Sequence, residues 1–197
     1  MSALKPVFFF LLFFIVVSSC STDASKDKAD TLEEQLPKVD TSKFRKYKGE
    51  GFSIQLLKEM TVNEASGMMV LDADFLPKEY HLSIEPIPIT HFRNDSEFPK
   101  KPDEQLHWLM NQEVKRIVSG PKKSEVLPLE KTTVDGARCV KQTIYGYEYG
   151  FPLRKAILLR YYLAKDAIIK ITAWTTVENA KEYEKLAQYM GMSFRMD

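Results

Sequence analysis

The sequence predicts an α+β fold with a mostly antiparallel sheet. Strand-like runs are joined by short hairpin loops, and two helical patterns occur far apart in the chain. About 150 residues follow position 46, which is enough for one hydrophobic core. These observations together indicate a single α+β domain.

Three strands are predicted in the first part of this domain, over residues 51–57, 68–71 and 80–89. Apolar residues alternate with polar ones in the first, as in a strand with one buried face. Pro86 and Pro88 lie near the end of the third, and proline has no N–H to donate to a neighbouring strand. We therefore expect the end of that strand at an edge of the sheet.

Two helices are predicted. The first is bounded by Pro102 and Gly120. Its apolar residues share one stripe: Leu106, Met110, Val114 and Ile117. Thr175 and Glu178 have capping-box spacing and open the second helix, which Gly191 ends. The apolar face of the second helix carries Ala180, Tyr183, Ala187 and Met190.

The strongest strand patterns lie between and after these boundaries. They cover residues 125–129, 137–149, 153–163 and 167–174, and a short hairpin loop joins the last two. We assume a register that pairs Leu163 with Ala167 and Tyr149 with Arg154. One face of the hairpins is then aliphatic and is expected in the core: Val140, Ile144, Ile157, Leu159, Ile169 and Ile171.

The opposite face of these hairpins is too apolar to face water and too rich in Tyr and Arg for an ordinary core. It carries Tyr145, Tyr147, Tyr149, Leu158, Arg160, Tyr162, Ile168 and Trp174. In one explanation a helix or the N-terminal part of the domain covers it. A covered Arg160 would then need a carboxylate, and strand alternation points Glu148 the other way.

In the second explanation, part of this face stays open as a binding surface, because Tyr, Trp and Arg are enriched at binding hot spots. The residues assigned to partner binding are Tyr145, Tyr147, Tyr149, Arg160, Tyr162 and Trp174.

The domain also resembles a known superfamily. Gly51-Phe52-Ser53-Ile54, the late hairpins and a final helix running into Met192-Ser193-Phe194 are similar to the PsbP-like superfamily over residues 47–197. Its members include photosystem II extrinsic subunits, a nuclear import factor that binds a small GTPase, and bacterial lipoproteins similar to DcrB. The resemblance implies an antiparallel sheet with helices on both faces, an α/β/α sandwich. Many members have Pro and then Trp after the first strand, where this chain has Leu57 and Met60.

The N-terminus resembles a bacterial lipoprotein signal peptide over residues 1–19. Lys5 supplies a positive charge, and the apolar run of residues 7–17 is shorter than the about 20 residues that cross ~30 Å of hydrocarbon. Val17-Ser18-Ser19-Cys20 is similar to a lipobox, which implies lipidation of Cys20. The alternative is an ordinary secretory signal that happens to end in cysteine.

The segment after Cys20 is predicted to be a flexible tether. Residues 21–46 are polar and of mixed charge, so they bury too little apolar surface to offset their conformational entropy. The expected organisation is therefore a signal peptide (1–19), a lipidated cysteine with its tether (20–46) and a PsbP-like domain (47–197). We expect a membrane-anchored protein of the bacterial cell envelope, facing away from the cytoplasm.

Composition and motifs argue against several functions. The net charge is +1, and it is 0 without residues 1–19, which argues against nucleic acid as a partner. His81, His91 and His107 lack the helical spacing of metal sites, and no nucleophile or phosphate-loop motif occurs. We expect no catalytic residue, metal or cofactor. Cys139 is expected to be a small buried hydrophobe, with a reactive thiol as the alternative.

Three functions remain open at this stage. The first is a non-enzymatic, lipid-anchored accessory protein that binds an envelope protein. The second is a small-molecule or lipid binder with a cleft between sheet and helix. The third is an enzyme whose site is assembled only in three dimensions. Because members of the superfamily share no single activity, the resemblance guides the fold rather than the function.

Overall fold

The structure is a computed structural model, and it describes residues 32–196 apart from residues 93, 121 and 148–151. Within these residues, nine strands form one sheet in the order β1-β8-β9-β10-β11-β6-β5-β4, with β7 also paired to β9. All pairs are antiparallel except β1 with β8. The strands are β1 (Leu32–Glu33), β4 (Thr61–Val62), β5 (Leu71–Phe75), β6 (Tyr80–Pro88), β7 (Glu125–Val126), β8 (Glu130–Val134), β9 (Ala137–Gly146), β10 (Lys155–Leu163) and β11 (Ala167–Thr176).

A second, smaller sheet contains three strands of the described chain. Its order is β12-β3-β2, and both pairs are antiparallel. The strands are β2 (Phe44–Gly49), β3 (Phe52–Leu57) and β12 (Arg195–Met196). The last strand therefore returns to the first hairpin of the domain.

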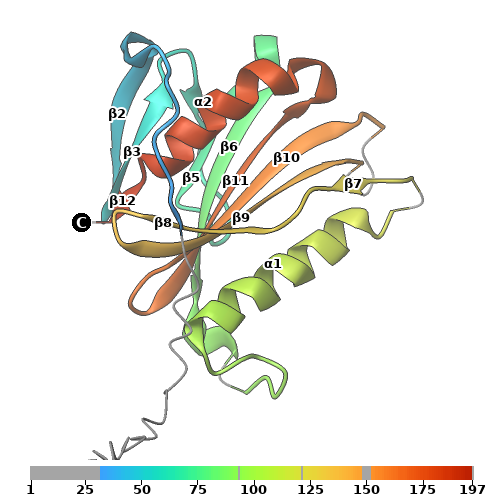
Figure 1. The fold of residues 1–197 in the computed structure, drawn as a ribbon. Coiled ribbons are helices and arrows are strands. Elements are labelled where there is room, and N and C mark those ends of the chain that lie inside the picture. The colour runs from blue at the N-terminus through green and yellow to red at the C-terminus, as the bar shows by residue number, and fades with distance from the viewer. Residues whose placement is uncertain (1–31, 93, 121, 148–151, 197) are drawn as a thin grey trace, which may run out of the picture. The chain divides into compact units, whose positions relative to one another are not determined.

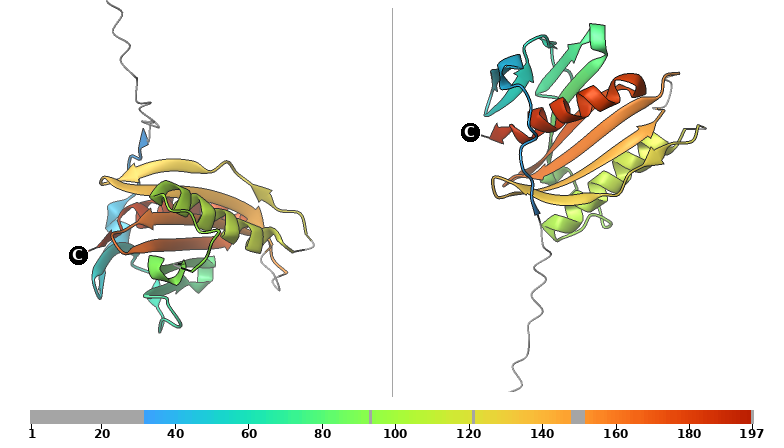
Figure 2. Two further views of the ribbon diagram at one scale, coloured as in Figure 1. Left: turned by 90° about the horizontal axis from the view of Figure 1, so that it is seen from below. Right: turned by 45° about the horizontal axis from the view of Figure 1, so that its top comes forward.

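Two α-helices, α1 (Pro102–Val118) and α2 (Ala180–Met192), pack on opposite faces of the large sheet (Figure 1). The left view of Figure 2, seen from below, shows α1 in front of the strands of the large sheet. Short 3-10 turns occur at η1 (Thr41–Lys43), η2 (Leu76–Lys78), η3 (Ile89–Phe92) and η4 (Val177–Asn179). The predicted α+β class, with an antiparallel sheet and helices on both faces, is confirmed.

Each helix covers its own hydrophobic core. The α2 core joins that helix to β3, β5, β6 and one face of β11, and its members include Ile54, Leu82, Ile171 and Tyr183. The α1 core joins that helix to the opposite face of the sheet, and its members include Met110, Ile144, Leu159 and Ile168. The predicted stripes agree with this arrangement. The buried residues of α1 include Leu106, Met110 and Ile117, and those of α2 include Ala180, Tyr183, Ala187 and Met190.

The register of the β10–β11 hairpin differs from the predicted one by a single residue. Leu163 pairs with Ile168, and the Ala164 N–H donates to the Ala167 carbonyl at 2.9 Å. A one-residue slip moves every side chain of a strand to the other face. Trp174 and Ile168 therefore lie on the α1 face, while Ile169 and Ile171 lie in the α2 core.

Regular structure occurs in the described part of the segment assigned to the tether. The strand β1, the turn η1 and the start of β2 all lie before residue 47. Phe44 is buried in the α2 core and its ring contacts that of Tyr189, so this part of the chain does bury apolar surface. The structure therefore places secondary structure and buried apolar side chains on both sides of residue 47.

Of two local predictions, one is wrong and one is confirmed. The capping box does not form, because Thr175 belongs to β11, and α2 begins at Ala180 after the turn η4. The prediction for Pro86 and Pro88 is confirmed, since β5 pairs with β6 only as far as Ile84, and the proline-bearing end has β11 as its neighbour.

Candidate functional site

The six residues predicted to bind a partner do not form one surface. Cys20 and Tyr149 lie outside the described residues. Arg160, Tyr162 and Tyr145 share the face of the sheet that α2 covers, as their pairings with Lys141, Cys139 and Ala156 show. Trp174 lies on the opposite face, against Ile157 and His81. Tyr147 follows the end of β9, next to Lys122.

Arg160 and Tyr162 are part of the covered layer rather than an open surface. Arg160 is 6% exposed and Tyr162 is 5% exposed. The Tyr162 hydroxyl donates to the Gly191 carbonyl of α2 at 2.8 Å. This geometry supports the first explanation, in which a helix covers the Tyr/Arg face.

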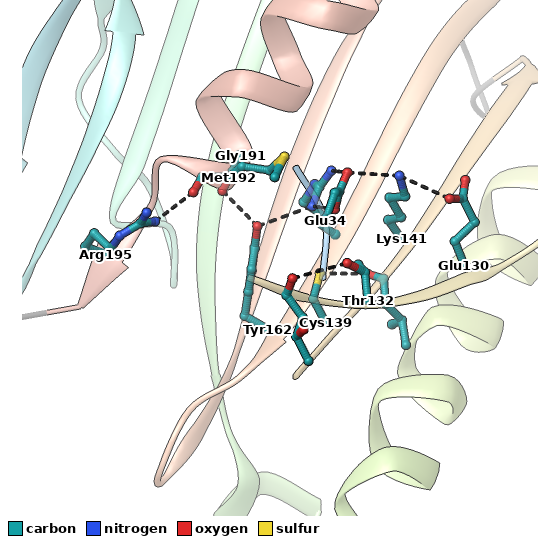
Figure 3. A network of polar contacts seen from close by, with 12 residues as sticks. Glu34, Glu130, Thr132, Cys139, Lys141, Tyr162, Gly191, Met192 and Arg195 are labelled. Atoms are coloured by element: carbon teal, nitrogen blue, oxygen red, sulfur yellow. Dashed lines mark hydrogen bonds and ion pairs between the residues drawn. The ribbon is translucent and has the colours of Figure 1, made fainter. Parts of the chain in front are cut away.

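The carboxylate that a covered Arg160 requires comes from Glu34, just after β1. Arg160 Nη1 donates to Glu34 Oε2 at 2.7 Å, and Nη2 donates to Oε1 at 2.8 Å. Lys141 Nζ also contacts Glu34 Oε1 at 2.9 Å and reaches Glu130 Oε2 at 3.1 Å. Figure 3 shows Glu34 between Lys141 on one side and Tyr162 with Gly191 on the other.

Local structure explains how these groups meet. Arg160 and Lys141 are directly opposite in the β9–β10 ladder, so both side chains leave the same face of the sheet. Leu32 and Glu33 pair in parallel with Thr132 and Thr133, and the Glu34 N–H donates to the Thr133 carbonyl at 3.1 Å. This short pairing places the Glu34 carboxylate over the two cations.

The electrostatics of the cluster favour its charged form. Burial alone would raise the pKa of Glu34, but the hydrogen bonds and charges of Arg160 and Lys141 outweigh it and hold that pKa below the ordinary value of 4.5. Glu34 thus remains ionised at neutral pH. A bidentate guanidinium–carboxylate pair of this kind fixes both direction and distance.

Gly191 makes room for the buried guanidinium. A Cβ atom at this position would lie 3.2 Å from Arg160 Cδ and 3.3 Å from Nε. Arg160 therefore packs against the last turn of α2, where the helix dipole favours a positive charge. The sequence shows Gly191 as a helix end, but it does not show this contact.

A crevice of about 70 Å³ adjoins the cluster between α2 and the sheet. Leu158, Ile171, Ala173 and Ala187 supply its apolar lining. Polar side chains supply the rest, among them Glu130, Lys141, Thr143, Arg160, Glu184 and Gln188. This is a small cleft between sheet and helix with a mixed polar and apolar lining.

A second surface, here called the basic end, lies where β7, β9 and β10 terminate. A hollow there is lined by Lys122, Lys123, Ser124, Glu125, Tyr147 and Arg154, and the basic end also includes Val126 and Leu153, the chain neighbours of Glu125 and Arg154. Lys122 Nζ lies 4.3 Å from the centre of the Tyr147 ring, and Arg154 is 3.7 Å from Glu125. Leu153 is 54% exposed and Val126 is 39% exposed, so apolar and cationic groups are presented together.

The remaining candidates for parts of a metal or catalytic site are cysteine and histidine residues. In the described part of the chain, no group of three or more His, Cys, Asp or Glu is placed to hold a metal ion. Cys139 is buried, and burial raises the pKa of its thiol to about 11, so the buried-hydrophobe interpretation is supported. His81 is 3.4 Å from Asp72 and stacks on Trp174. None of the helices described in the structure is long and apolar enough to cross a bilayer.

Comparison with known proteins identifies the fold. No protein-family model and no curated protein sequence matches this chain. Among solved structures, cyanobacterial PsbP (CyanoP) from Synechocystis superposes with a TM-score of 0.55 at 13% identity, covering 83% of this chain and 98% of that one. The Ran-binding protein Mog1p from Saccharomyces cerevisiae gives 0.51 at 10% identity, covering 78% and 95%.

A protein from Bacteroides thetaiotaomicron also gives a TM-score of 0.51, at 9% identity, covering 79% of this chain and 49% of that one. At such low identities these likenesses concern the fold alone. The chain has the PsbP/Mog1p-like fold that the sequence resemblance implied.

Proposed function

We propose that this protein is a lipid-anchored, non-enzymatic accessory protein of the bacterial cell envelope, and that it binds a protein partner. The signal-like residues 1–19 and the lipobox around Cys20 support the anchor and the location. The fold supports partner binding by analogy, because one protein that shares it, Mog1p, is a Ran-binding protein.

The observation that carries partner binding is the composition of the basic end. Lys122, Lys123 and Arg154 bring positive charge to one place, and Glu125 offsets part of it. Two exposed apolar residues, Leu153 and Val126, are chain neighbours of Arg154 and Glu125. Tyr and Arg flanked by apolar groups are typical of the centre of an interface, and cations at its rim select an acidic partner. The partner surface is therefore acidic with an apolar centre.

The anchor is tested by labelling cells with an alkyne-bearing fatty acid and comparing the wild type with Cys20→Ala. The wild type is expected to carry the label and to sediment with membranes, whereas the variant does neither. Equal labelling of both proteins would refute lipidation at Cys20, because this change removes the only thiol in the lipobox.

Partner binding is tested by cross-linked capture from intact cells. The double variant Lys122→Glu with Lys123→Glu places like charges against an acidic partner, which costs several kcal/mol, so recovery of the main cross-linked protein should fall about tenfold or more.

Lys100→Glu with Lys101→Glu is the matched control, since these lysines form another exposed pair, just before the start of α1. Equal losses in both double variants would indicate a general charge effect and would contradict a role for the basic end. Circular dichroism checks that each variant keeps its fold.

A further inference from the structure

The segment that delivers Glu34 is lightly attached to the domain. Its ladder to β8 has two residues and one further backbone hydrogen bond. Glu33, Gln35, Leu36 and Lys38 are exposed, and Leu36 is 53% exposed despite being apolar. Glu34 is the deeply inserted side chain between residues 33 and 38, with 12% of its side chain exposed.

The cationic site beneath Glu34 is built without this segment. Arg160 and Lys141 are held by neighbouring strands in the middle of the sheet. The Tyr162 hydroxyl lies 3.5 Å from Arg160 Nη1. Gly191 packs closely against the Arg160 side chain and restricts the position of its guanidinium group. With Glu34 in place, 7% of the Arg160 side chain is exposed, and a guanidinium held this close to the sheet favours an anion beside it.

The crevice beside α2 extends this cationic site with an apolar floor. Arg160 and Lys141 line it together with Leu158, Ala173 and Ala187, while Glu130 and Glu184 also belong to its lining. Its volume of about 70 Å³ is roughly half of the ~150 Å³ cavity that accommodates benzene, which corresponds to about three carbon atoms. The crevice and the cations therefore suit a carboxylate joined to a short apolar chain.

We propose that Arg160, Lys141 and this crevice form a binding site for small aliphatic carboxylic acids, in which Glu34 is a built-in occupant. The ligand carboxylate takes the place of the Glu34 carboxylate on Arg160 and Lys141, and its chain lies on the apolar floor. This site lies apart from the basic end, and its proposed function, binding a small acid, is distinct from the proposed binding of a protein partner.

The chain itself competes with the ligand. Because Glu34 is joined to the domain, it acts as an intramolecular ligand at a high effective concentration. The wild-type protein therefore binds the acid weakly, and detachment or substitution of Glu34 exposes the site. Glu34→Ala removes the competing carboxylate and retains both cations.

The test compares butyrate, acetate and butyramide at equal ionic strength and pH 7.5, with the full-length protein purified in detergent. Isothermal titration and thermal melting are recorded for the wild type, Glu34→Ala and Glu34→Ala with Arg160→Met. Butyramide has the shape of butyrate without its charge, and acetate has the charge without the longer chain.

Glu34→Ala is expected to bind butyrate about tenfold more tightly than acetate, because two more methylenes are buried. Butyramide should bind at least tenfold more weakly than butyrate, and the wild type should bind butyrate at least tenfold more weakly than Glu34→Ala. In the double variant the preference for butyrate over butyramide should disappear.

Equal binding of butyrate and butyramide by Glu34→Ala, or an unchanged preference in the double variant, would overturn the proposal. If Glu34→Ala is poorly folded, butyrate should raise its melting temperature and butyramide should not. Glu34→Gln, which keeps the size of the side chain, is measured in the same way. No carboxylate-specific stabilisation in either variant would also refute the site.

Discussion

Removal of the Glu34 charge should destabilise the whole domain. Glu34→Gln keeps the size of the side chain and leaves Arg160 and Lys141 without their shared counter-charge. Breaking a buried ion pair by removing one partner costs about 3–5 kcal/mol. Since 12% of the Glu34 side chain and 19% of the Lys141 side chain are exposed, water relieves part of this loss. We expect the free energy of unfolding to fall by about 3 kcal/mol, at the lower end of that range.

The assay is equilibrium unfolding in urea, followed by circular dichroism and extrapolated linearly to water. A double-mutant cycle with Arg160→Met isolates the pair, because the double variant removes both charges and fills the space with an apolar side chain. The coupling energy should be about 2 kcal/mol. An unfolding free energy of Glu34→Gln within about 0.5 kcal/mol of the wild type would show that the pair does not hold the segment in solution.

Three further predictions concern the same region. Because the folded pKa of Glu34 lies below its ordinary value, its stabilisation is present above about pH 4.5 and is lost as the pH falls through the folded pKa. The stability gap between the wild type and Glu34→Gln should therefore shrink in urea titrations from pH 7 to pH 3, and a constant gap would contradict this. Gly191→Ala should lower the free energy of unfolding by about 1 kcal/mol, because over-packing against Arg160 outweighs the gain in helix propensity, whereas a more stable variant would show that Arg160 can move aside. Cys139, which is 2% exposed, should react with iodoacetamide at pH 7.5 only in urea, and fast labelling of the folded protein would be inconsistent with its burial and raised pKa.

The sequence predicted the parts of the fold where periodicity is strong. The α1 stripe and the α2 face have helical spacing over three or more turns, and β10 and β11 are long apolar runs. It missed β8, which is short and polar and lies next to the two-residue edge strand β1, and it placed β5 a few residues too early. Such strands are defined by their neighbours rather than by a pattern of their own.

The register of the β10–β11 hairpin could not be predicted for a related reason. Ile168 and Ile169 are adjacent apolar residues, and each face of this sheet is covered by a helix. Either register therefore buries an isoleucine on either face, and the hydrophobic pattern does not select one. The consequence was the misplacement of Trp174 beside Arg160.

The polar cluster was predicted only in part. Strand alternation placed Arg160 on the Tyr/Arg face, and one of the two explanations for that face, a covering layer, required a carboxylate near the buried charge. Glu34 could not be identified as that carboxylate, because it lies in a polar segment whose ladder to β8 has only two residues. A buried arginine without a partner in its own hairpins is the signal that points to an acidic residue elsewhere in the chain.

The Glu34 contact also sets how far the domain can travel from the membrane, if Cys20 is the anchor as proposed. The chain from Cys20 to Leu32 is 12 residues long (32 − 20), so its full extension is at most about 43 Å. Release of Glu34 and of the chain as far as Phe44 gives 24 residues (44 − 20) and at most about 86 Å. Release of this segment would thus double the maximum extension of the chain, and a ligand that displaces Glu34 removes one of the contacts that hold the segment.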